Sequence, residues 1–357
     1  MNSYGIKYHQ NMYIARTKLQ RALLIIGIIL LFASPGYLDD HWLILVNEIG
    51  ISIIVALGIY VAISCGIVNL GQAGFMCIGA FTSGILCAKT GCSPWVVLPL
   101  AIVVSGLMGA LCGLMVSQIK GFIATVVTIA IGIIIPGLFG VLLPSFDLPV
   151  EAVAIPKSIS VAGITVDDEG EYLFLIWFFA LLVTFLALNL GRSRIGRAFR
   201  STRDNEMVSE TLGMNIRWHK ASALLICSIF AGIGGWLWAC YYSSVSIGDF
   251  KFAESLLYLG IVVLGGMNSI AGIFLGSIVI RSIKFGLVNH LIPWLEDMFS
   301  TGSWYGAIPI SDLSRLGGII PLFLGTIFIV VFILSPSGMV GWWNKFTTYY
   351  RAWPLPR

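Results

Sequence analysis

The sequence predicts an all-α fold: a polytopic transmembrane helical bundle of about ten spans with both termini in the cytoplasm. Of the 357 residues, 58% are hydrophobic and only 11% are charged, whereas a soluble domain has about 25% charged residues. The hydrophobic residues fall in runs close to the ~20 residues that a helix needs to cross a bilayer. The 40 glycines and 11 tryptophans are typical of closely packed membrane helices with aromatic anchors at the interfaces.

The hydrophobic runs define ten candidate spans in a single transmembrane domain covering residues 1–357. The first run follows a basic N-terminal tail and is typical of a retained helix rather than a cleaved signal peptide. The eighth and ninth are interrupted by glycines, and they are compatible with two helices, a helix plus a re-entrant segment, or one kinked span. The ten predicted spans are 21–35, 43–66, 70–88, 94–116, 122–143, 172–190, 220–242, 252–267, 270–290 and 316–336.

Basic residues predict the orientation of these spans. Lysine and arginine concentrate in the N-terminal tail, at Lys120, in the connection 191–219 and in the C-terminal tail. Ten spans place all four regions on one side, which the positive-inside rule identifies as the cytoplasm. The opposite side receives an acidic outer-face loop at 144–171. We therefore predict a multi-pass protein of a bacterial inner (plasma) membrane.

Motifs for several classes of chemistry are missing from the sequence. It contains no GxxxxGK[ST] phosphate-binding loop, so we expect any ATP to be bound by another chain. The four histidines do not cluster with a nucleophile or an acid, and the sequence predicts no enzyme. The seven cysteines form no CxxC pair, so we interpret them as small buried hydrophobic residues and expect no metal and no cofactor. No motif for nucleic acid is present.

Apart from residues at the very ends of the predicted spans, the ionisable residues within them are few: Glu48, Glu254, Arg281 and Lys284. Each such residue costs ~2.5–3.5 kcal/mol at the centre of a membrane helix, and such residues therefore tend to mark function. We interpret these four as anchors of helix ends or as partners of lipid headgroups. Their small number argues against a proton- or sodium-coupled carrier and favours an external source of energy.

The connection 191–219 predicts a short amphipathic helix near residues 205–212. Asp204 is the expected N-cap, Glu206 suits the first turn, and Gly213 suits the position after the helix. The hydrophobic flank of this helix consists of Met207, Val208 and Leu212. Such a flank fits either docking to a cytoplasmic subunit or contact with lipid headgroups, and the residues alone leave both functions open.

This connection resembles the cytoplasmic loop of the branched-chain amino acid permease family of ABC importers, the LivH/LivM type, with urea permeases as close relatives. The matching residues are Arg194, Gly196, Arg197, Ala198, Arg200, Arg203, Asn205, Glu206, Gly213, Asn215 and Lys220. Further matching segments are 66–81, 120–130, 231–237, 262–277 and 333–341. The long N-terminus and the chain length favour the LivM-type subunit.

The resemblance implies a permease subunit that moves branched-chain amino acids or a related small polar solute by alternating access. It also implies ATP-binding cytoplasmic subunits, a second permease subunit and a periplasmic solute-binding protein as partners within the lipid bilayer. A stand-alone carrier or channel, or a membrane scaffold without transport, are the alternatives. The expected ATPase-coupling loop comprises Arg197, Arg200, Arg203, Asn205, Glu206, Gly213 and Asn215.

One departure from the family leaves the solute open. The outer connection keeps Ile155 and Pro156 but lacks the glycine-rich element that commonly precedes this pair in the family. Branched-chain amino acids, other amino acids, short amides and urea therefore all remain candidates. The glycines of the chain suit close helix packing. Four residues could instead line the substrate pathway at a broken helix end, and they are Asn69, Gly71, Gln72 and Gly74.

Overall fold

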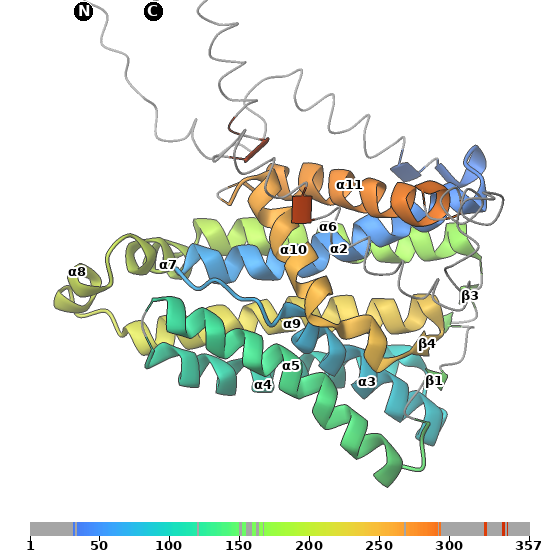
Figure 1. Cartoon of the computed structure of the whole chain (residues 1–357), viewed down its shortest axis with the longest axis horizontal. Coiled ribbons are helices and arrows are strands. Elements are labelled where there is room, and N and C mark those ends of the chain that lie inside the picture. The colour runs from blue at the N-terminus through green and yellow to red at the C-terminus, as the bar shows by residue number, and fades with distance from the viewer. Residues whose placement is uncertain are drawn as a thin grey trace, which may run out of the picture.

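The structure is a computed structural model, and it forms a bundle of long helices (Figure 1). It describes residues 31–32, 34–119, 121–149, 152–154, 159–161, 164–166, 168–267, 269–291, 293, 325–326, 338–339 and 341. In these ranges, seven helices are long and apolar enough to cross a membrane. They are α2 (Asp40–Ser64), α3 (Gln72–Thr90), α4 (Pro94–Ser117), α5 (Phe122–Ser145), α6 (Glu169–Arg192), α9 (Ile216–Tyr242) and α11 (Ile270–Gly286, continued by a π-helical turn at Leu287–Leu291).

These seven helices coincide, to within a few residues at each end, with seven of the ten predicted spans. The predicted span 252–267 is a helix, α10 (Phe252–Gly265), but it has only 14 residues. Its length is about 21 Å at 1.5 Å per residue, which is less than the ~30 Å of the hydrocarbon core. The expectation of a complete eighth span is therefore not confirmed. The predicted spans 21–35 and 316–336 lie almost entirely outside the described residues.

Helices α10 and α11 form an antiparallel hairpin, which excludes the single kinked span among the three arrangements that the sequence left open. Their contacts pair Gly265 with Gly272 and Ile261 with Gly276, so the two chains run in opposite directions. A Cβ on Gly265 or Gly276 would clash with the backbone of the facing helix. Because these glycines have no side chain, the backbones of the two helices can come into direct contact.

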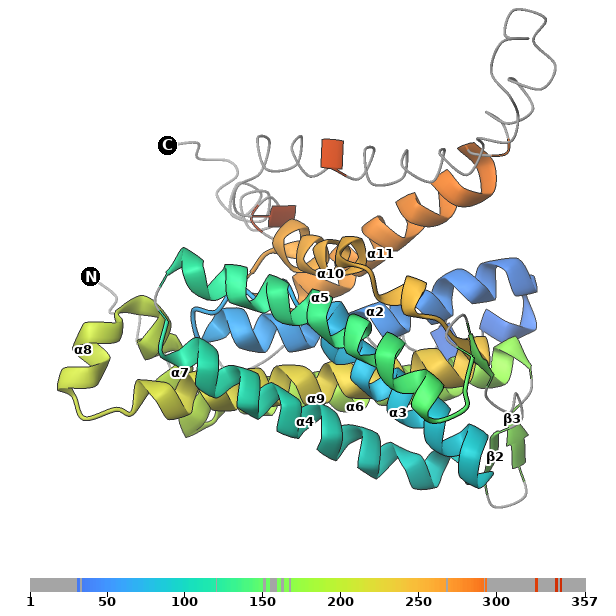
Figure 2. The ribbon, with the colours of Figure 1, turned by 60° about the horizontal axis from the view of Figure 1, so that its bottom comes forward.

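Helix α9 forms the centre of the bundle and packs against α2, α3 and α4 (Figure 2). Its Trp236 is fully buried and donates a hydrogen bond from Nε1 to the carbonyl of Pro94 at 2.9 Å. The indole of Trp236 also makes edge contacts with Trp95 and Phe179. An aromatic cluster therefore joins α9 to α4 and α6.

Short elements connect the helices at the two ends of the bundle. One end carries two antiparallel pairs of strands and two 3₁₀ turns, and the other carries two helices between α6 and α9 (Figure 1). The strands are β1 (Val153–Ala154) paired with β4 (Ser244–Val245), and β2 (Ile159–Val161) paired with β3 (Ile164–Val166). The other elements are η2 (Ser34–Gly36), η3 (Ile247–Phe250), α7 (Arg194–Asp204) and α8 (Glu206–Thr211). The predicted outer-face loop 144–171 therefore contains β1, β2 and β3.

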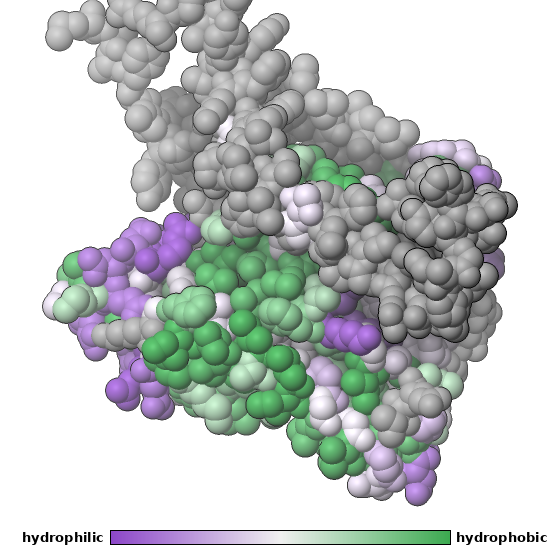
Figure 3. Space-filling model, viewed as in Figure 1, coloured by the Kyte–Doolittle hydropathy of each residue, from purple (hydrophilic) through white to green (hydrophobic). Residues whose placement is uncertain are grey.

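The surface of the bundle is divided into an apolar side and a polar end. Hydrophobic residues gather over α4 and α5, and hydrophilic residues gather at the end formed by α7 and α8 (Figure 3). Large apolar side chains along α4 and α5, such as Leu107, Met115, Ile134 and Val141, are more than half exposed. This distribution is the one expected of a bundle whose sides contact lipid or another membrane subunit and whose end contacts water.

The close contact between α3 and α9 generates a stability prediction. A Cβ at Gly79 would lie 2.7 Å from the Cα of Gly232. Gly79→Val should therefore lower the free energy of unfolding by ~1–3 kcal/mol through overpacking. Gly137→Val, at an exposed position with nothing within 4 Å of the added Cβ, is the matched control. Thermal unfolding in detergent measures both, and equal stability of the two variants would contradict this packing.

Candidate functional site

The connection between α6 and α9 folds into two helices rather than one. Helix α7 begins after Ser193, whose hydroxyl accepts a hydrogen bond from the backbone N–H of Gly196 at 3.2 Å. Helix α8 begins after Asn205, whose side-chain oxygen accepts from the N–H of Val208 at 3.2 Å. The prediction that Asp204 caps the short helix is wrong, because Asp204 is the last residue of α7 and Asn205 is the extended residue between the helices.

Gly213 terminates α8 in the way that the sequence predicts. Its φ of +82° is in the left-handed region, which glycine adopts without the strain imposed by a Cβ. The N–H of Gly213 bonds to the carbonyl of Glu210 at 3.0 Å, and the N–H of Met214 bonds to the carbonyl of Ser209 at 3.1 Å. This pair of bonds is a Schellman motif, and it fixes the direction in which the chain enters α9.

A buried ion pair attaches α8 to the membrane helix that follows it. Lys220 on α9 has a side chain only 5% exposed, and its Nζ lies 2.7 Å from Oε1 of Glu206 on α8. Asn215 caps α9 by accepting from the N–H of Trp218 at 3.3 Å. The two caps, the Schellman motif and this ion pair hold α8 in a defined position relative to α9.

The outer surface of α8 is apolar and exposed. Met207, Val208 and Leu212 are 74%, 52% and 72% exposed, and the neighbouring Trp218 is 67% exposed. The three arginines predicted for the coupling loop, Arg197, Arg200 and Arg203, lie on α7, which precedes α8. The connection thus presents an exposed apolar surface on α8 beside the arginine-rich helix α7.

A second unusual feature is the entry into α3. Helix α2 ends at Ser64 and α3 begins only at Gln72, and residues 67–71 between them have no regular secondary structure. Gly66 contacts α7 at the polar end of the bundle, whereas Gly71 contacts α5 at Thr128 and Gly132. The chain therefore runs from the end of the bundle into its interior without helical hydrogen bonds, and α3 begins inside the bundle (Figure 1).

Side chains from other helices satisfy the backbone of this broken segment. The N–H of Leu70 bonds to the hydroxyl of Thr128 on α5 at 3.1 Å. The N–H of Ala73, in the first turn of α3, bonds to the hydroxyl of Ser255 on α10 at 2.9 Å. The N–H of Gly71 bonds to the side-chain oxygen of Asn69 at 2.9 Å. These bonds replace those that a continuous helix would make, as a membrane interior requires.

The four residues predicted for the substrate pathway all lie at this break. Asn69 and Gln72 are fully buried and are bonded to each other at 2.8 Å. Gln72 also donates to the carbonyl of Val55 at 2.9 Å. Gly71 and Gly74 pack against the backbone of α5. The structure thus brings the four together in a packed arrangement, and their role in the pathway stays a prediction.

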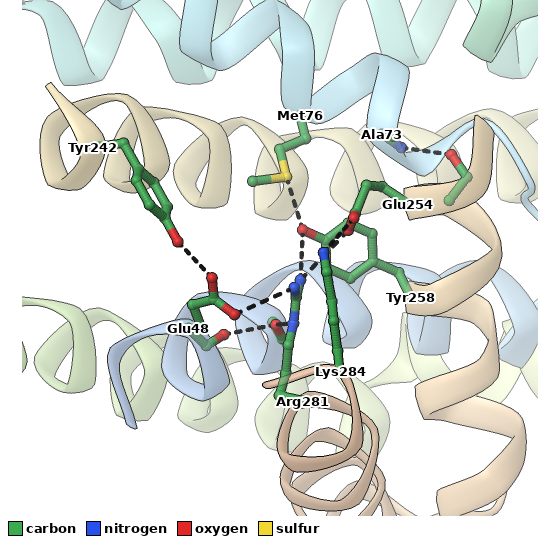
Figure 4. A network of polar contacts seen from close by, with 10 residues as sticks. Glu48, Ala73, Met76, Tyr242, Glu254, Tyr258, Arg281 and Lys284 are labelled. Atoms are coloured by element: carbon green, nitrogen blue, oxygen red, sulfur yellow. Dashed lines mark hydrogen bonds and ion pairs between the residues drawn. The ribbon is translucent and has the colours of Figure 1, made fainter. Parts of the chain in front are cut away.

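A buried charge cluster is the feature that the sequence interpretation missed. We define it as Glu48 on α2, Glu254 on α10, and Arg281 and Lys284 on α11 (Figure 4). Arg281 is 1% exposed and lies 3.6 Å from Glu48 and 3.8 Å from Glu254, and Lys284 lies 2.5 Å from Glu254. The interpretation of Arg281 as a helix-end anchor is therefore wrong.

Hydroxyl groups complete the cluster. The guanidinium of Arg281 donates to the hydroxyls of Ser52 on α2 and Tyr258 on α10. Tyr242, at the end of α9, donates to Glu48. Among the described residues, Nη1 of Arg281 and Oε2 of Glu254 make ion pairs but no hydrogen bond. The cluster is electrically balanced, with two positive and two negative side chains, and it joins four helices.

The spacing of the charged and tyrosine residues along the sequence indicates the cluster, but only when the α10–α11 hairpin is known. Glu254 and Tyr258 are four residues apart, and Arg281 and Lys284 are three apart, so each pair shares one face of its helix. Only an antiparallel α10–α11 hairpin places the two faces opposite one another. The sequence left that hairpin undecided, and the pairing could not be deduced from it.

The chain matches a known protein family over most of its length. The profile of the family described as "Branched-chain amino acid transport system / permease component" matches residues 42–308. The chain belongs to this family. The matched range contains the broken segment, the connection between α6 and α9, and all four residues of the charge cluster.

Several curated proteins are similar to this family member. The high-affinity branched-chain amino acid transport system permease protein LivM of Escherichia coli K12 is 30% identical over 73% of this chain and 67% of its own length. The LivM protein of Salmonella typhimurium is 32% identical over 64% of this chain and 60% of its own length. The nucleoside ABC transporter permease protein NupC of Lactococcus lactis is 24% identical over 63% of this chain and 73% of its own length. No solved structure matches. These similarities identify an ABC importer permease subunit.

The charge cluster generates a prediction for Arg281. Arg281→Met should lower the free energy of unfolding by ~3–5 kcal/mol, because it leaves the buried carboxylate of Glu48 without its cation. Lys284→Met is the matched control on the same helix; the side chain of Lys284 is 22% exposed and Arg281 still faces Glu254 in this variant, so its loss should cost less than the loss of Arg281. Thermal unfolding in detergent measures both variants. Adding Glu48→Gln to Arg281→Met should recover part of the stability, and no recovery would contradict the pairing.

Proposed function

We propose that this permease subunit moves branched-chain amino acids or a related small polar solute by alternating access, driven by separate cytoplasmic ATPase subunits. A second permease subunit and a periplasmic solute-binding protein complete the importer, and the chain itself carries no ATPase site. One observation carries the proposal: α8 displays Met207, Val208 and Leu212 to solvent while its caps and the Glu206–Lys220 ion pair fix it to α9.

The orientation follows from the basic residues. Five arginines lie between Arg192 and Arg203 at the end of the bundle that carries α7 and α8, and the positive-inside rule places this end in the cytoplasm of a bacterial inner membrane. The α10–α11 hairpin then enters the membrane from the outer side. Adding the predicted spans 21–35 and 316–336 to α2–α6, α9 and this hairpin puts both termini in the cytoplasm in the proposed topology.

The coupling loop has two parts in this proposal. The exposed residues of α8 insert into a groove of an ATPase subunit, and burial of apolar side chains supplies the affinity, at ~25 cal/mol per Å² of apolar surface. Asn205, Gly213 and Asn215 fix the ends of the helices, as their caps support. Arg197, Arg200 and Arg203 on α7 supply the positive charge of the loop beside α8.

The substrate route is proposed to pass the start of α3. A helix that begins inside the bundle directs backbone N–H groups and the positive end of its dipole toward the interior, which suits a solute carboxylate. Asn69 and Gln72 provide amide groups at this point, and Gly71 and Gly74 allow the close backbone approach. Because Asn69 and Gln72 are bonded to protein partners, the route requires these groups to exchange partners as the transporter opens.

The substrate class rests on relatives. The two LivM proteins, which are named for branched-chain amino acid transport, support amino acids ahead of other solutes. Binding of the solute to the cognate binding protein, measured by thermal shift against leucine, isoleucine, valine and urea, tests this assignment directly. Stabilisation by urea alone would reject it.

If α8 couples the permease to the ATPase, variants of α8 should insert into the membrane normally but lose transport. Leu212→Asp should reduce ATP-driven uptake at least ~10-fold in the reconstituted importer, because a charge on the docking surface would have to be desolvated in the groove. Gly213→Val should act similarly, since a β-branched residue cannot adopt φ +82° without strain. Uptake into proteoliposomes and ATP hydrolysis are measured together.

Tyr37→Asp provides the control for this experiment. Tyr37 is 61% exposed and precedes α2 at the opposite end of the bundle. A carboxylate introduced there lies far from α8 and should leave uptake near the wild-type rate. All variants are compared at equal amounts of inserted protein. Normal coupled uptake by both Leu212→Asp and Gly213→Val would reject docking through α8.

A further inference from the structure

A cavity of about 280 Å³ lies beside the coupling loop. Its walls come from three helices: α2 contributes Tyr60 and Ser64, α6 contributes Ala187 and Leu190, and α7 contributes Arg200 and Arg203. Since a water molecule occupies about 30 Å³ in the liquid, the space would hold roughly nine waters. It is therefore the size of a small ligand group rather than a packing defect.

The charge of this cavity is positive. Two arginines line it, and no aspartate or glutamate appears among its described lining residues. Arg203 lies 3.6 Å from Asp204, but that carboxylate is 73% exposed and is not among the residues that line the cavity. Tyr60 and Ser64 also line the wall, and the Ser64 hydroxyl donates its proton to the carbonyl of Tyr60 at 2.8 Å. The groups here that suit a phosphate oxyanion are therefore the arginine guanidiniums, which can each donate two parallel hydrogen bonds to it.

The position of the cavity indicates which phosphate it fits. It lies where α2 ends at Ser64 and α6 ends at Arg192, which is the cytoplasmic boundary of the membrane in the proposed orientation. Apolar side chains, including Ala187 and Leu190, form the wall on the membrane helices, while the arginines come from α7. A ligand with a phosphate at one end and an apolar part at the other matches this division, and basic pockets between membrane helices on the cytoplasmic side bind anionic lipid headgroups.

We propose that this cavity binds the phosphodiester headgroup of an anionic phospholipid from the inner leaflet. The lipid bridges α2, α6 and α7 and so fixes the base of the coupling loop against the membrane. The inference rests on the proposed cytoplasmic orientation of this loop. Its test needs neither the ATPase nor the substrate, so failure of the lipid site and failure of the transport proposal are separable.

The experiment measures lipid binding to the full-length chain in neutral detergent. Phosphatidylglycerol, phosphatidylcholine with the same acyl chains, and sodium phosphate are titrated separately, with thermal unfolding and native mass spectrometry as readouts. Phosphatidylglycerol should stabilise the protein and remain bound, and phosphatidylcholine should do neither. Arg200→Gln with Arg203→Gln should weaken phosphatidylglycerol binding roughly 30-fold, because each arginine near an anionic headgroup strengthens binding about fivefold.

Two controls separate this cavity from a general attraction of lipids to a basic helix. Arg194→Gln with Arg197→Gln removes the same charge from α7 at positions that do not line the cavity, and it should change the affinity less than about threefold. Ala187→Leu fills the space without altering charge and should also weaken binding.

Three results would overturn the proposal. Equal losses in the two arginine double variants would show diffuse attraction. Full binding by Ala187→Leu would place the lipid elsewhere. Stabilisation by sodium phosphate without an effect of phosphatidylglycerol would assign the cavity to a soluble anion.

Discussion

The need to satisfy every backbone polar group within the membrane determines the arrangement of the other helices around α3. Residues 67–71 cross part of the bundle without helical hydrogen bonds, and in hydrocarbon an unsatisfied group costs several kcal/mol. Thr128 from α5, Ser255 from α10 and the neighbouring Asn69 supply the missing partners. The break can therefore exist only where α5 and α10 both approach it, and the glycines at 71, 74 and 132 make that approach possible on the side of α5.

This constraint connects the break to the charge cluster. Ser255 follows Glu254 in the chain, so the residue that caps α3 adjoins a carboxylate of the cluster. One turn later, Tyr258 accepts a hydrogen bond from Arg281 and donates one to Met76 on α3. Helix α10 thus contacts the start of α3 on one face and the charged residues of α11 on another. A buried ion cluster contributes little net stability, but it has discrete pairings, which suits an element that must hold α10 in a small number of positions.

The elements that the sequence predicted correctly are those determined by residues close together in the chain. Seven hydrophobic runs became membrane-length helices, and Gly213 ends α8 with the positive φ expected of its type. The break before α3 and the close contacts of Gly71 and Gly74 were also indicated by the glycines. The sequence could not show that Asn205 rather than Asp204 is the N-cap of α8. Both residue types favour that position, and only the backbone conformation distinguishes them. The partners of Arg281 could not be predicted, because Glu48 is distant in the chain and its contact depends on how the α10–α11 hairpin packs on α2.

The broken segment also adjoins α7, the first helix of the proposed coupling loop. Gly66, which immediately precedes it, has φ +86°, and a Cβ there would be only 3.3 Å from the Cα of Arg203 on α7. The end of α7 therefore packs directly on the chain that leads to the start of α3, and α8 follows after the single residue Asn205. A rigid displacement of α7 and α8 by a docked subunit would press on a segment that has no helical hydrogen bonds of its own to resist it. A continuous helix would transmit such a push along its whole length, whereas an extended segment allows the start of α3 to exchange partners while α3 itself stays helical.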